Sequence, residues 1–353
     1  MQSIRYTRGT DAGYLIHFFK NPSLFNGEQE EYAMNTFWKT YGRVAWLMAG
    51  IVLLSAVVTA FAGRVGLPRR DKTVVTATYP LYVAVENILG DTDALAVENL
   101  TGSAAGCLHD YQLSPANRIA LENAALVLLN GGGAESFLDD TLTSLPDLPT
   151  VDTSAGLTLL ESCHSHEHPH GDEPTDGEHD HAINEHLWVS PTCYAAQVAA
   201  ATEALCALDP ENTATYTANG EAYRQQVLAV GARLRAAAQK SAGKTCIIFH
   251  DSLAYLAEEL GLTVAASLHV GEESGVSAAD LAAAQRAVSD DPNVLLLYDS
   301  QYAVRYAAID ALVPADHVLS VDTAVIGRGC ASDWLDAMTN NAIILENIKG
   351  GEQ

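Results

Sequence analysis

The feature that most constrains the fold is the regular alternation of short β-branched runs with helical segments. The run at 73–78 (TVVTAT) predicts a buried strand, and a helix is expected from about 81 to 89. Further strands are expected at 94–100 and 125–130, with a helix that opens on Ser-Pro at 114–123 between them. Because strands alternate with helices, the sheet should be parallel.

The same rhythm returns in the second half of the chain. Expected strands cover 245–249, 262–265 and 293–298, and expected helices cover 252–260 and 278–289. Between the halves, residues 191–240 are rich in Ala and helical, with an interruption at Leu208-Asp209-Pro210 and then a long helix. We therefore predict an α/β fold with an N-terminal lobe at 73–190, a linking region at 191–240 and a C-terminal lobe at 244–350.

One stretch, residues 161–185, breaks the α/β pattern with His, Asp, Glu, Gly and Pro and has too little apolar content to pack. Imidazole and carboxylate groups suit zinc and related divalent ions. Ordering such a segment costs about 1–2 kcal/mol of backbone entropy per residue, so we expect weak auxiliary binding rather than one rigid site. The alternative is a solvated acidic linker. The histidines concerned are His164, His166, His168, His170, His179 and His181.

The chain is strongly acidic, with 19 Lys and Arg against 44 Asp and Glu and a formal charge of −25. This charge repels phosphate backbones and anionic lipid headgroups, so nucleic acid is a poor partner and a cation is a natural one. Acidity also serves colloidal stability in many soluble proteins, so it does not identify a function alone.

An apolar run at 45–62, preceded by Lys39 and Arg43, determines the expected compartment. It matches either a signal peptide or a membrane anchor at the lower length limit of about 18 residues. Residues 1–44 are then a cytoplasmic tail or a mis-assigned extension, with Met34 as the alternative start. Both readings place the rest of the protein outside the cytoplasm, in the periplasm or on the outer face of the cell membrane.

The six cysteines are scattered and none has C-x-x-C spacing, so we do not expect cysteine to bind the metal. In an exported protein, Cys246 and Cys330 could form a disulfide, although buried free thiols are the default expectation.

Three isolated histidines stand where a strand or loop gives way to a helix. They are His109 in LHDY, His186 in EHLW and His250 in FHDS. In α/β domains this position presents ligands beyond the carboxyl ends of the strands. Each histidine taken singly would more often be structural than a ligand. His269 and His317 have no such setting, and we take them as non-ligands.

Several motifs follow one another in a fixed order along the chain. They are VVTATYPL near Val74, HDYQLSP at His109, ALVLLNGGGAESFLD at Ala125, a His-rich insertion before EHLWVSP, ALDPENTATYTANGEAYRQQV, FHDSLAYLAEELGL at His250, ESGVSAADL at Glu273 and LSVDTAV at Leu319. Over nearly all of residues 73–348 the chain resembles the cluster A-I metal-binding receptors of zinc and manganese ABC importers.

The resemblance implies two α/β domains with parallel sheets, joined by a long rigid helix, with the ion in the cleft between the domains. His109 and His186 would bind the ion from the N-terminal lobe. His250 and a carboxylate at Asp322 would bind it from the C-terminal lobe.

Two departures from the family pattern concern the fourth ligand. Zinc-type members often carry an acid before the first histidine, where this chain has Leu108. The turn after Asp322 is Thr323-Ala324 rather than Pro-Leu, so either Asp322 or a water is expected to fill the fourth position. The carboxylates adjacent in sequence to the histidines are candidate partners for their second ring nitrogens: Asp110, Glu185 and Asp251.

The expected ligand is Zn²⁺, because manganese-type members tend to carry Glu where this chain has His250, and three imidazoles favour zinc. Mn²⁺ is the less favoured alternative. The resemblance implies an ABC permease and its ATPase as partners. We expect a monomer without catalytic activity that contacts the membrane only through its N-terminal segment or the permease.

Two other functions compete with the importer reading. A zinc hydrolase is disfavoured, since the sequence has neither H-E-x-x-H nor G-x-S-x-G. A metal-buffering metallochaperone that works without a transporter stays open, because the His-rich segment alone would suit it. Permease and ATPase genes beside this one would favour the importer.

Overall fold

The computed structural model describes residues 27–62, 72–102, 111–162, 183–239, 245–268, 277–301 and 306–348. The chain divides into two compact units, residues 1–69 and 70–353. Each unit is considered by itself.

The first unit contains the helix α2 (Gly27–Ala62), which includes the predicted export segment. Large apolar side chains lie on its surface, among them Trp46 and Leu53, which are 72% and 70% exposed. Within the described ranges, no helix combines the length and the apolar character needed to span a membrane.

The N-terminal lobe is built on a four-stranded parallel sheet in the order β2-β1-β3-β4. Its strands are β1 (Thr73–Thr76), β2 (Ala96–Asn99), β3 (Ala124–Leu129) and β4 (Thr150–Asp152), and its helices are α3 (Tyr79–Leu89), α4 (Pro115–Glu122) and α5 (Asp139–Thr143). Helix α3 begins two residues before the predicted start, because Pro80 is tolerated in a first turn. The three-residue β4, too short to stand out, was not predicted.

The C-terminal lobe repeats this arrangement with a parallel sheet in the order β6-β5-β7-β8. Its strands are β5 (Thr245–Ile248), β6 (Thr263–Ser267), β7 (Leu295–Asp299) and β8 (Val318–Val321), and its helices are α8 (Leu253–Glu259), α9 (Ala278–Asp290), α10 (Ala307–Asp310) and α11 (Asp333–Glu346). The predicted α/β class with two parallel sheets is confirmed. Strand β8, at the sheet edge, was not predicted.

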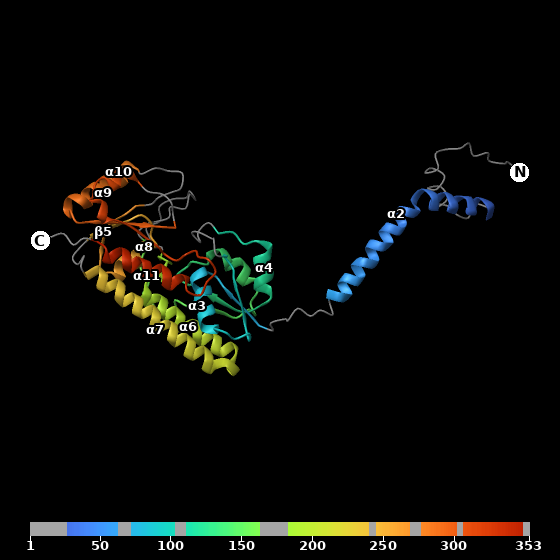
Figure 1. The fold of residues 1–353 in the computed structure, drawn as a ribbon, viewed down its shortest axis with the longest axis horizontal. Coiled ribbons are helices and arrows are strands. Elements are labelled where there is room, and N and C mark those ends of the chain that lie inside the picture. Colours follow the sequence, from blue (N-terminus) through green and yellow to red (C-terminus); the bar gives the residue numbers. More distant parts are fainter. Residues whose placement is uncertain are drawn as a thin grey trace, which may run out of the picture. The chain divides into compact units, whose positions relative to one another are not determined.

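The linking region forms two packed helices, α6 (Pro191–Leu208) and the 26-residue α7 (Thr213–Ala238). A short 3₁₀ turn, Pro210–Asn212, separates them, as the interruption in the sequence indicates. A Cβ at Gly220 would lie only 2.2 Å from Thr202 Oγ1, so the glycine permits the close approach of the two helices. Helix α7 contacts α3 of one lobe and α11 of the other and runs beneath both (Figure 1).

One continuous apolar core joins the two lobes. At its centre the rings of Tyr194 and Trp334 stack with centroids 4.3 Å apart. The indole N–H of Trp334 donates to the carbonyl of Trp188, and the indole N–H of Trp188 donates to the carbonyl of Thr323. The shared core ties the lobes to α6 and α7, and this favours small tilts over wide opening.

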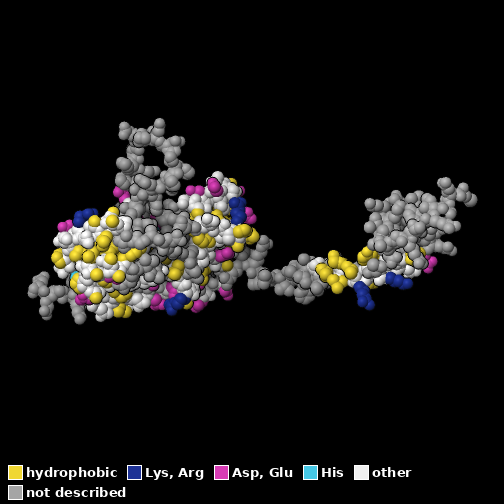
Figure 2. Space-filling model, turned by 90° about the horizontal axis from the view of Figure 1, so that it is seen from above, with side chains coloured by type: hydrophobic (Ala, Val, Ile, Leu, Met, Phe, Trp, Pro, Cys, Tyr) yellow, Lys and Arg dark blue, Asp and Glu magenta, His cyan; other side chains and the backbone are white. Residues whose placement is uncertain are grey.

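Acidic side chains are scattered over the face of residues 72–348 seen in Figure 2, among apolar and uncharged ones. On this face they do not gather into one patch.

Candidate metal centre

His186 lies on the segment that enters the linking helices. The backbone N–H of Asn184 donates to the carbonyl of Leu160, which ties the segment to the N-terminal lobe. His186 is 5% exposed and is followed by a 3₁₀ turn, Leu187–Val189. Ser190 then caps α6 by accepting from the N–H of Cys193. The chain around the imidazole is thus fixed on both sides.

The side chain of Asn184 determines which nitrogen of His186 can bind a metal. Its Oδ1 accepts from the backbone N–H of His186 at 3.1 Å, and its Nδ2 donates to the carbonyl of Asp251 at 2.8 Å. These two bonds fix the orientation of the amide. Oδ1 also lies 3.0 Å from His186 Nδ1, which must therefore carry the proton. The electron pair is left on Nε2, as metal binding through that atom requires.

His250 follows β5 and precedes α8, at the carboxyl end of its parallel sheet. The backbone N–H of Ser252 donates to His250 Nδ1 at 3.1 Å, an arrangement that places the ring proton on Nε2. The hydroxyl of Ser252 is 2.9 Å from the same nitrogen and can donate a hydrogen bond to it in this tautomer. Metal binding through Nε2 would move the proton to Nδ1, and Ser252 Oγ is in place to accept that hydrogen bond.

The structure brings the two histidines together from opposite lobes. Their ring centroids are 5.2 Å apart and the rings are nearly perpendicular, at 86°. Two imidazoles bound through Nε2 to one tetrahedral zinc, with Zn–N bonds of about 2 Å, would have centroids about 5 Å apart. The centroid distance of the pair is therefore compatible with a shared zinc ion.

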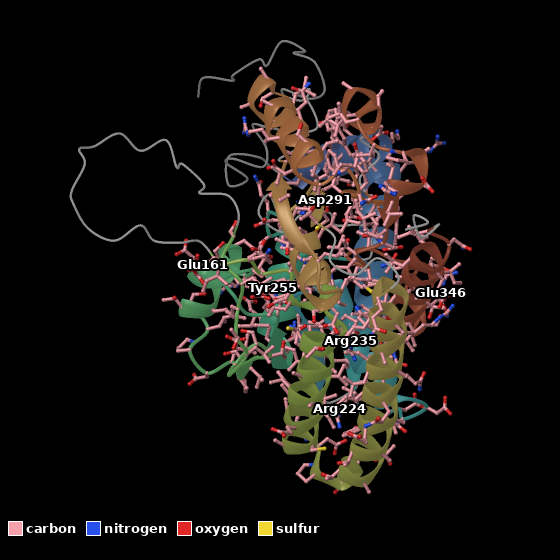
Figure 3. The ribbon with its side chains drawn as sticks, turned by 90° about the vertical axis from the view of Figure 1, so that its left-hand side faces the viewer. Glu161, Arg224, Arg235, Tyr255, Asp291 and Glu346 are labelled. Carbon is pink, nitrogen blue, oxygen red and sulfur yellow. The ribbon has the colours of Figure 1, made fainter. Side chains whose placement is uncertain are left out.

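Contacts at the base of the His-rich segment reinforce this pairing. The hydroxyl of Tyr255 on α8 donates to the carbonyl of Asn184 and accepts from the N–H of Leu160. Ser162 donates to the Asp251 carboxylate at 2.6 Å. Figure 3 shows Tyr255 beside the part of the N-terminal lobe that carries Glu161. Residues next to both histidines are thus linked across the lobes.

Sequence adjacency predicted the wrong partners for these two imidazoles. The groups at Nδ1 are Asn184 and Ser252, each two residues away, rather than Glu185 and Asp251. Glu185 instead has Oε1 3.8 Å from Nε2 of His186, the nitrogen that faces the expected ion. Asp110, the third predicted partner, lies outside the described residues.

A buried hydrogen-bond network that the sequence did not reveal holds the backbone of Glu185. Asn130 donates from Nδ2 to the carbonyl of Glu185 at 2.8 Å, and Gln197 donates to Asn130 Oδ1 at 3.0 Å. The Glu135 carboxylate accepts from the backbone N–H groups of Asn130 and Gly131. The NGGG run is visible in the sequence as a turn, but its contact with Glu185 could be seen only in the folded structure.

Asp322 has different surroundings. Its Oδ1 accepts from Gln301 Nε2 and from the N–H of Ala324, both at 2.8 Å, and burial raises the pKa of its carboxyl group. The residue lines a pocket of about 510 Å³ with Arg328 and Asp333. Across the described ranges, no three His, Cys, Asp or Glu side chains gather as a metal site. Asp322 is thus not brought together with the histidine pair, and its ligand role stays a prediction.

His109 and the six histidines of the segment 161–185 lie outside the described residues. The described part of the chain therefore supplies the pair His186 and His250.

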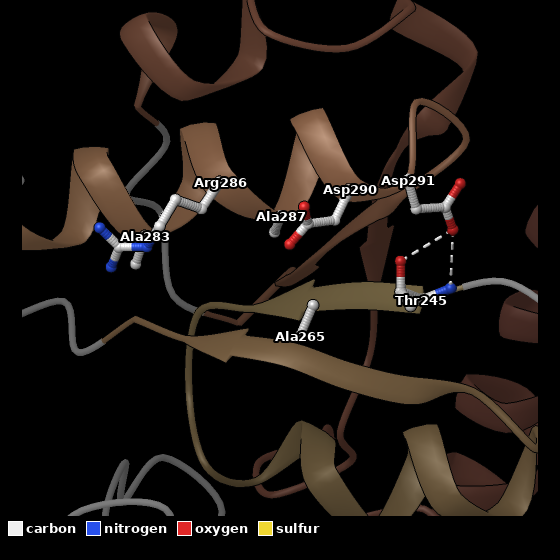
Figure 4. A pocket seen from close by; sticks show the side chains of 7 residues that line it. All are labelled: Thr245, Ala265, Ala283, Arg286, Ala287, Asp290 and Asp291. Atoms are coloured by element: carbon white, nitrogen blue, oxygen red, sulfur yellow. Dashed lines mark hydrogen bonds between the residues drawn. The ribbon is translucent and has the colours of Figure 1, made fainter.

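A second pocket, of about 410 Å³, is separate from this centre. It lies between α9 and strands β5 and β6, where Asp291 accepts hydrogen bonds from the N–H and hydroxyl of Thr245 (Figure 4). Thr245 begins β5, whereas His250 follows its carboxyl end. The pocket therefore lies toward the amino ends of the strands, whereas His250 lies beyond their carboxyl ends.

A family model described as "Zinc-uptake complex component A periplasmic" (ZnuA) matches residues 74–348. The chain belongs to this family. The resemblance predicted from the motifs is therefore confirmed.

Relatives within and around the family agree with this membership. The chain is 30% identical over 270 residues to the high-affinity zinc uptake system protein ZnuA of Paracoccus denitrificans, covering 67% of this chain and 79% of that protein. It is 29% identical over 195 residues to the iron-binding protein YfeA of Yersinia pestis, covering 55% and 58%.

Solved structures share the fold. The substrate-binding protein FpvC of Pseudomonas aeruginosa in complex with Mn²⁺ has a TM-score of 0.65 and 22% identity, over 79% of this chain and 98% of that one. A crystal structure of ZnuA has a TM-score of 0.59 and 21% identity, over 77% and 98%. The two-lobed ZnuA-family architecture is thus established for this chain.

Proposed function

We propose that this protein captures Zn²⁺ outside the cytoplasm and delivers it to an ABC-type importer, without catalysing a reaction. The observation that carries the proposal is the pair His186 and His250, which come from opposite lobes and have ring centroids 5.2 Å apart. The orientation of His186 by Asn184 and the membership of a zinc-uptake family support it.

The proposed ligand set is His109, His186 and His250, with a carboxylate or water in the fourth position. Three imidazoles favour zinc over manganese by ligand softness and by the Irving–Williams order. Relatives include proteins described as binding iron and manganese, so metal preference is part of the test.

An ion shared between the lobes would couple binding to their arrangement, because it bonds fully only when both lobes are in register. The common core limits that change to a small tilt. A permease that recognises the tilted form would distinguish loaded from empty protein. The His-rich segment would add weak sites that raise the local zinc concentration.

Titration calorimetry on residues 63–353 tests the proposal. We expect one tight zinc site and weaker additional sites, with Mn²⁺ bound less tightly. Deleting residues 164–181 should remove only the weak sites. Loss of the tight site with the loop would contradict this division of roles.

The substitution His186→Ala should lower affinity at the tight site by more than about 100-fold, because a lost direct ligand costs more than a lost outer partner. His317→Ala is the matched control, since His317 lies at a 3₁₀ turn before β8. An unchanged dissociation constant for His186→Ala would show that the site is misplaced.

A further inference from the structure

The fourth position of the zinc site takes either a water or a carboxylate, and neither of the positions suggested by the family pattern readily provides the carboxylate. The residue before His109 is Leu108, which has no donor atom. The Asp322 carboxylate accepts hydrogen bonds from Gln301 and Ala324 and lines a separate pocket. A dication held by imidazoles alone would keep its full charge in a half-buried place, and this is costly.

We propose that Glu185 supplies this carboxylate ligand, an inference that rests on the zinc-binding function proposed above. Its Oε1 lies 3.8 Å from His186 Nε2, and both side chains are 6% exposed. Tetrahedral zinc with bonds of about 2 Å places its ligand atoms about 3.3 Å apart, so the two atoms are within a small adjustment of sharing one ion.

The electrostatics of the pair point the same way. Because Asn184 keeps the proton of His186 on Nδ1, the atom that faces Glu185 presents an electron pair. A divalent cation placed between a carboxylate oxygen and this electron pair would be attracted by both.

The backbone of Glu185 is fixed by the hydrogen-bond network of Asn130 and by the glycine turn after β3. Asn130 donates to the Glu185 carbonyl at 2.8 Å. A Cβ at Gly132 would lie 3.4 Å from the Glu185 Cα, so the glycine turn packs against this residue. Since Glu185, His186 and His250 do not yet gather as a metal site in the described structure, the ion would draw the carboxylate and the second imidazole toward His186.

The test compares three charge-removing variants of residues 63–353: Glu185→Gln, Asp322→Asn and, as a matched control, the exposed Glu211→Gln in the linking region. Glu185→Gln keeps the size of the side chain and the backbone hydrogen bond from Asn130, so the fold should be retained, as circular dichroism would show. Zinc affinity is measured by competition with a chelating dye, and the ligand field by visible absorption with one equivalent of Co²⁺.

We expect Glu185→Gln to weaken zinc binding at least about tenfold and to change the Co²⁺ absorption, whereas Glu211→Gln changes neither. Wild-type affinity and an unchanged Co²⁺ spectrum in Glu185→Gln would overturn the assignment. A loss confined to Asp322→Asn would do so as well. If the wild-type protein itself binds no zinc tightly, the proposed function fails, and that result differs from either of these.

Discussion

At the scale of single residues, one asparagine does most to prepare the metal centre. Asn184 is fully buried, and both ends of its amide are engaged: Oδ1 with His186 and Nδ2 with the carbonyl of Asp251. Asn184 therefore sets the tautomer of His186. It also links His186 to Asp251, the residue that follows His250 in the chain. A carboxylate in this place would offer no N–H to Asp251.

The substitution Asn184→Ala should weaken zinc binding by about 10- to 100-fold, the usual effect of losing an outer-shell partner. Without Oδ1, His186 can take the tautomer with its proton on Nε2. Nitrogen chemical shifts of the histidine rings in the metal-free protein should report this change, which a purely structural role would not cause. The matched control is the exposed Asn123→Ala, whose side chain bonds only locally to Ile119. Unaltered ring shifts in Asn184→Ala would contradict the role given to this amide.

At the scale of elements, the turn after β3 supports the centre through a buried acid. Gly131 has a φ of 82°, and a Cβ there would meet the Asp152 side chain at 2.0 Å, so the turn requires glycine. The carboxyl group of Glu135 closes the turn by accepting from two backbone N–H groups. Burial, opposed in part by these hydrogen bonds, raises its pKa from 4.5 to about 7, and the nearby Asp152 adds to the rise.

This shift predicts how stability depends on pH. The folded state holds the proton of Glu135 up to about pH 7, whereas the unfolded chain releases it near pH 4.5. The contribution of this group to stability is therefore present below pH 4.5 and is lost as the pH rises to about 7, by on the order of 3 kcal/mol.

Urea denaturation at several pH values from 4.5 to 8 would measure the effect, with Glu135→Gln as the comparison. The variant should show a flatter dependence over this range, because glutamine does not ionise. Identical pH profiles for the variant and the wild-type protein would argue against a proton on Glu135.

The strands themselves were largely predictable at this scale. Runs such as TVVTAT and NVLLLY are β-branched or apolar, and they form β1 and β7. Two edge strands, β4 and β8, were missed because three or four residues with partial burial carry little periodic signal.

At the scale of the whole molecule, the two lobes share one core with the linking helices. Trp188 and Tyr194, at the entry to α6, meet Trp334 of α11 at the junction. The hydroxyl of Tyr79, at the start of α3, also donates to the Asp333 carboxylate of the other lobe. Residues 70–353 are accordingly one compact unit.

Residues 63–353 should therefore unfold in a single cooperative transition rather than lobe by lobe. Differential scanning calorimetry should give equal calorimetric and van't Hoff enthalpies, and tryptophan fluorescence should follow the same midpoint. One equivalent of zinc should raise that midpoint, since the ion binds only the folded state. Two resolved transitions would show that the lobes are independent.

The sequence by itself determined the α/β class, the family and the histidines to consider, because β-branched runs, glycine turns and spaced motifs are local patterns. Only the tertiary structure decided what surrounds those histidines. The contact of His186 with His250 joins residues 64 positions apart along the chain, and the choice of Asn184 over Glu185 at Nδ1 depends on the path of one turn. Distances between lobes and hydrogen-bond directions arise from packing, which leaves no periodic trace in the order of the amino acids.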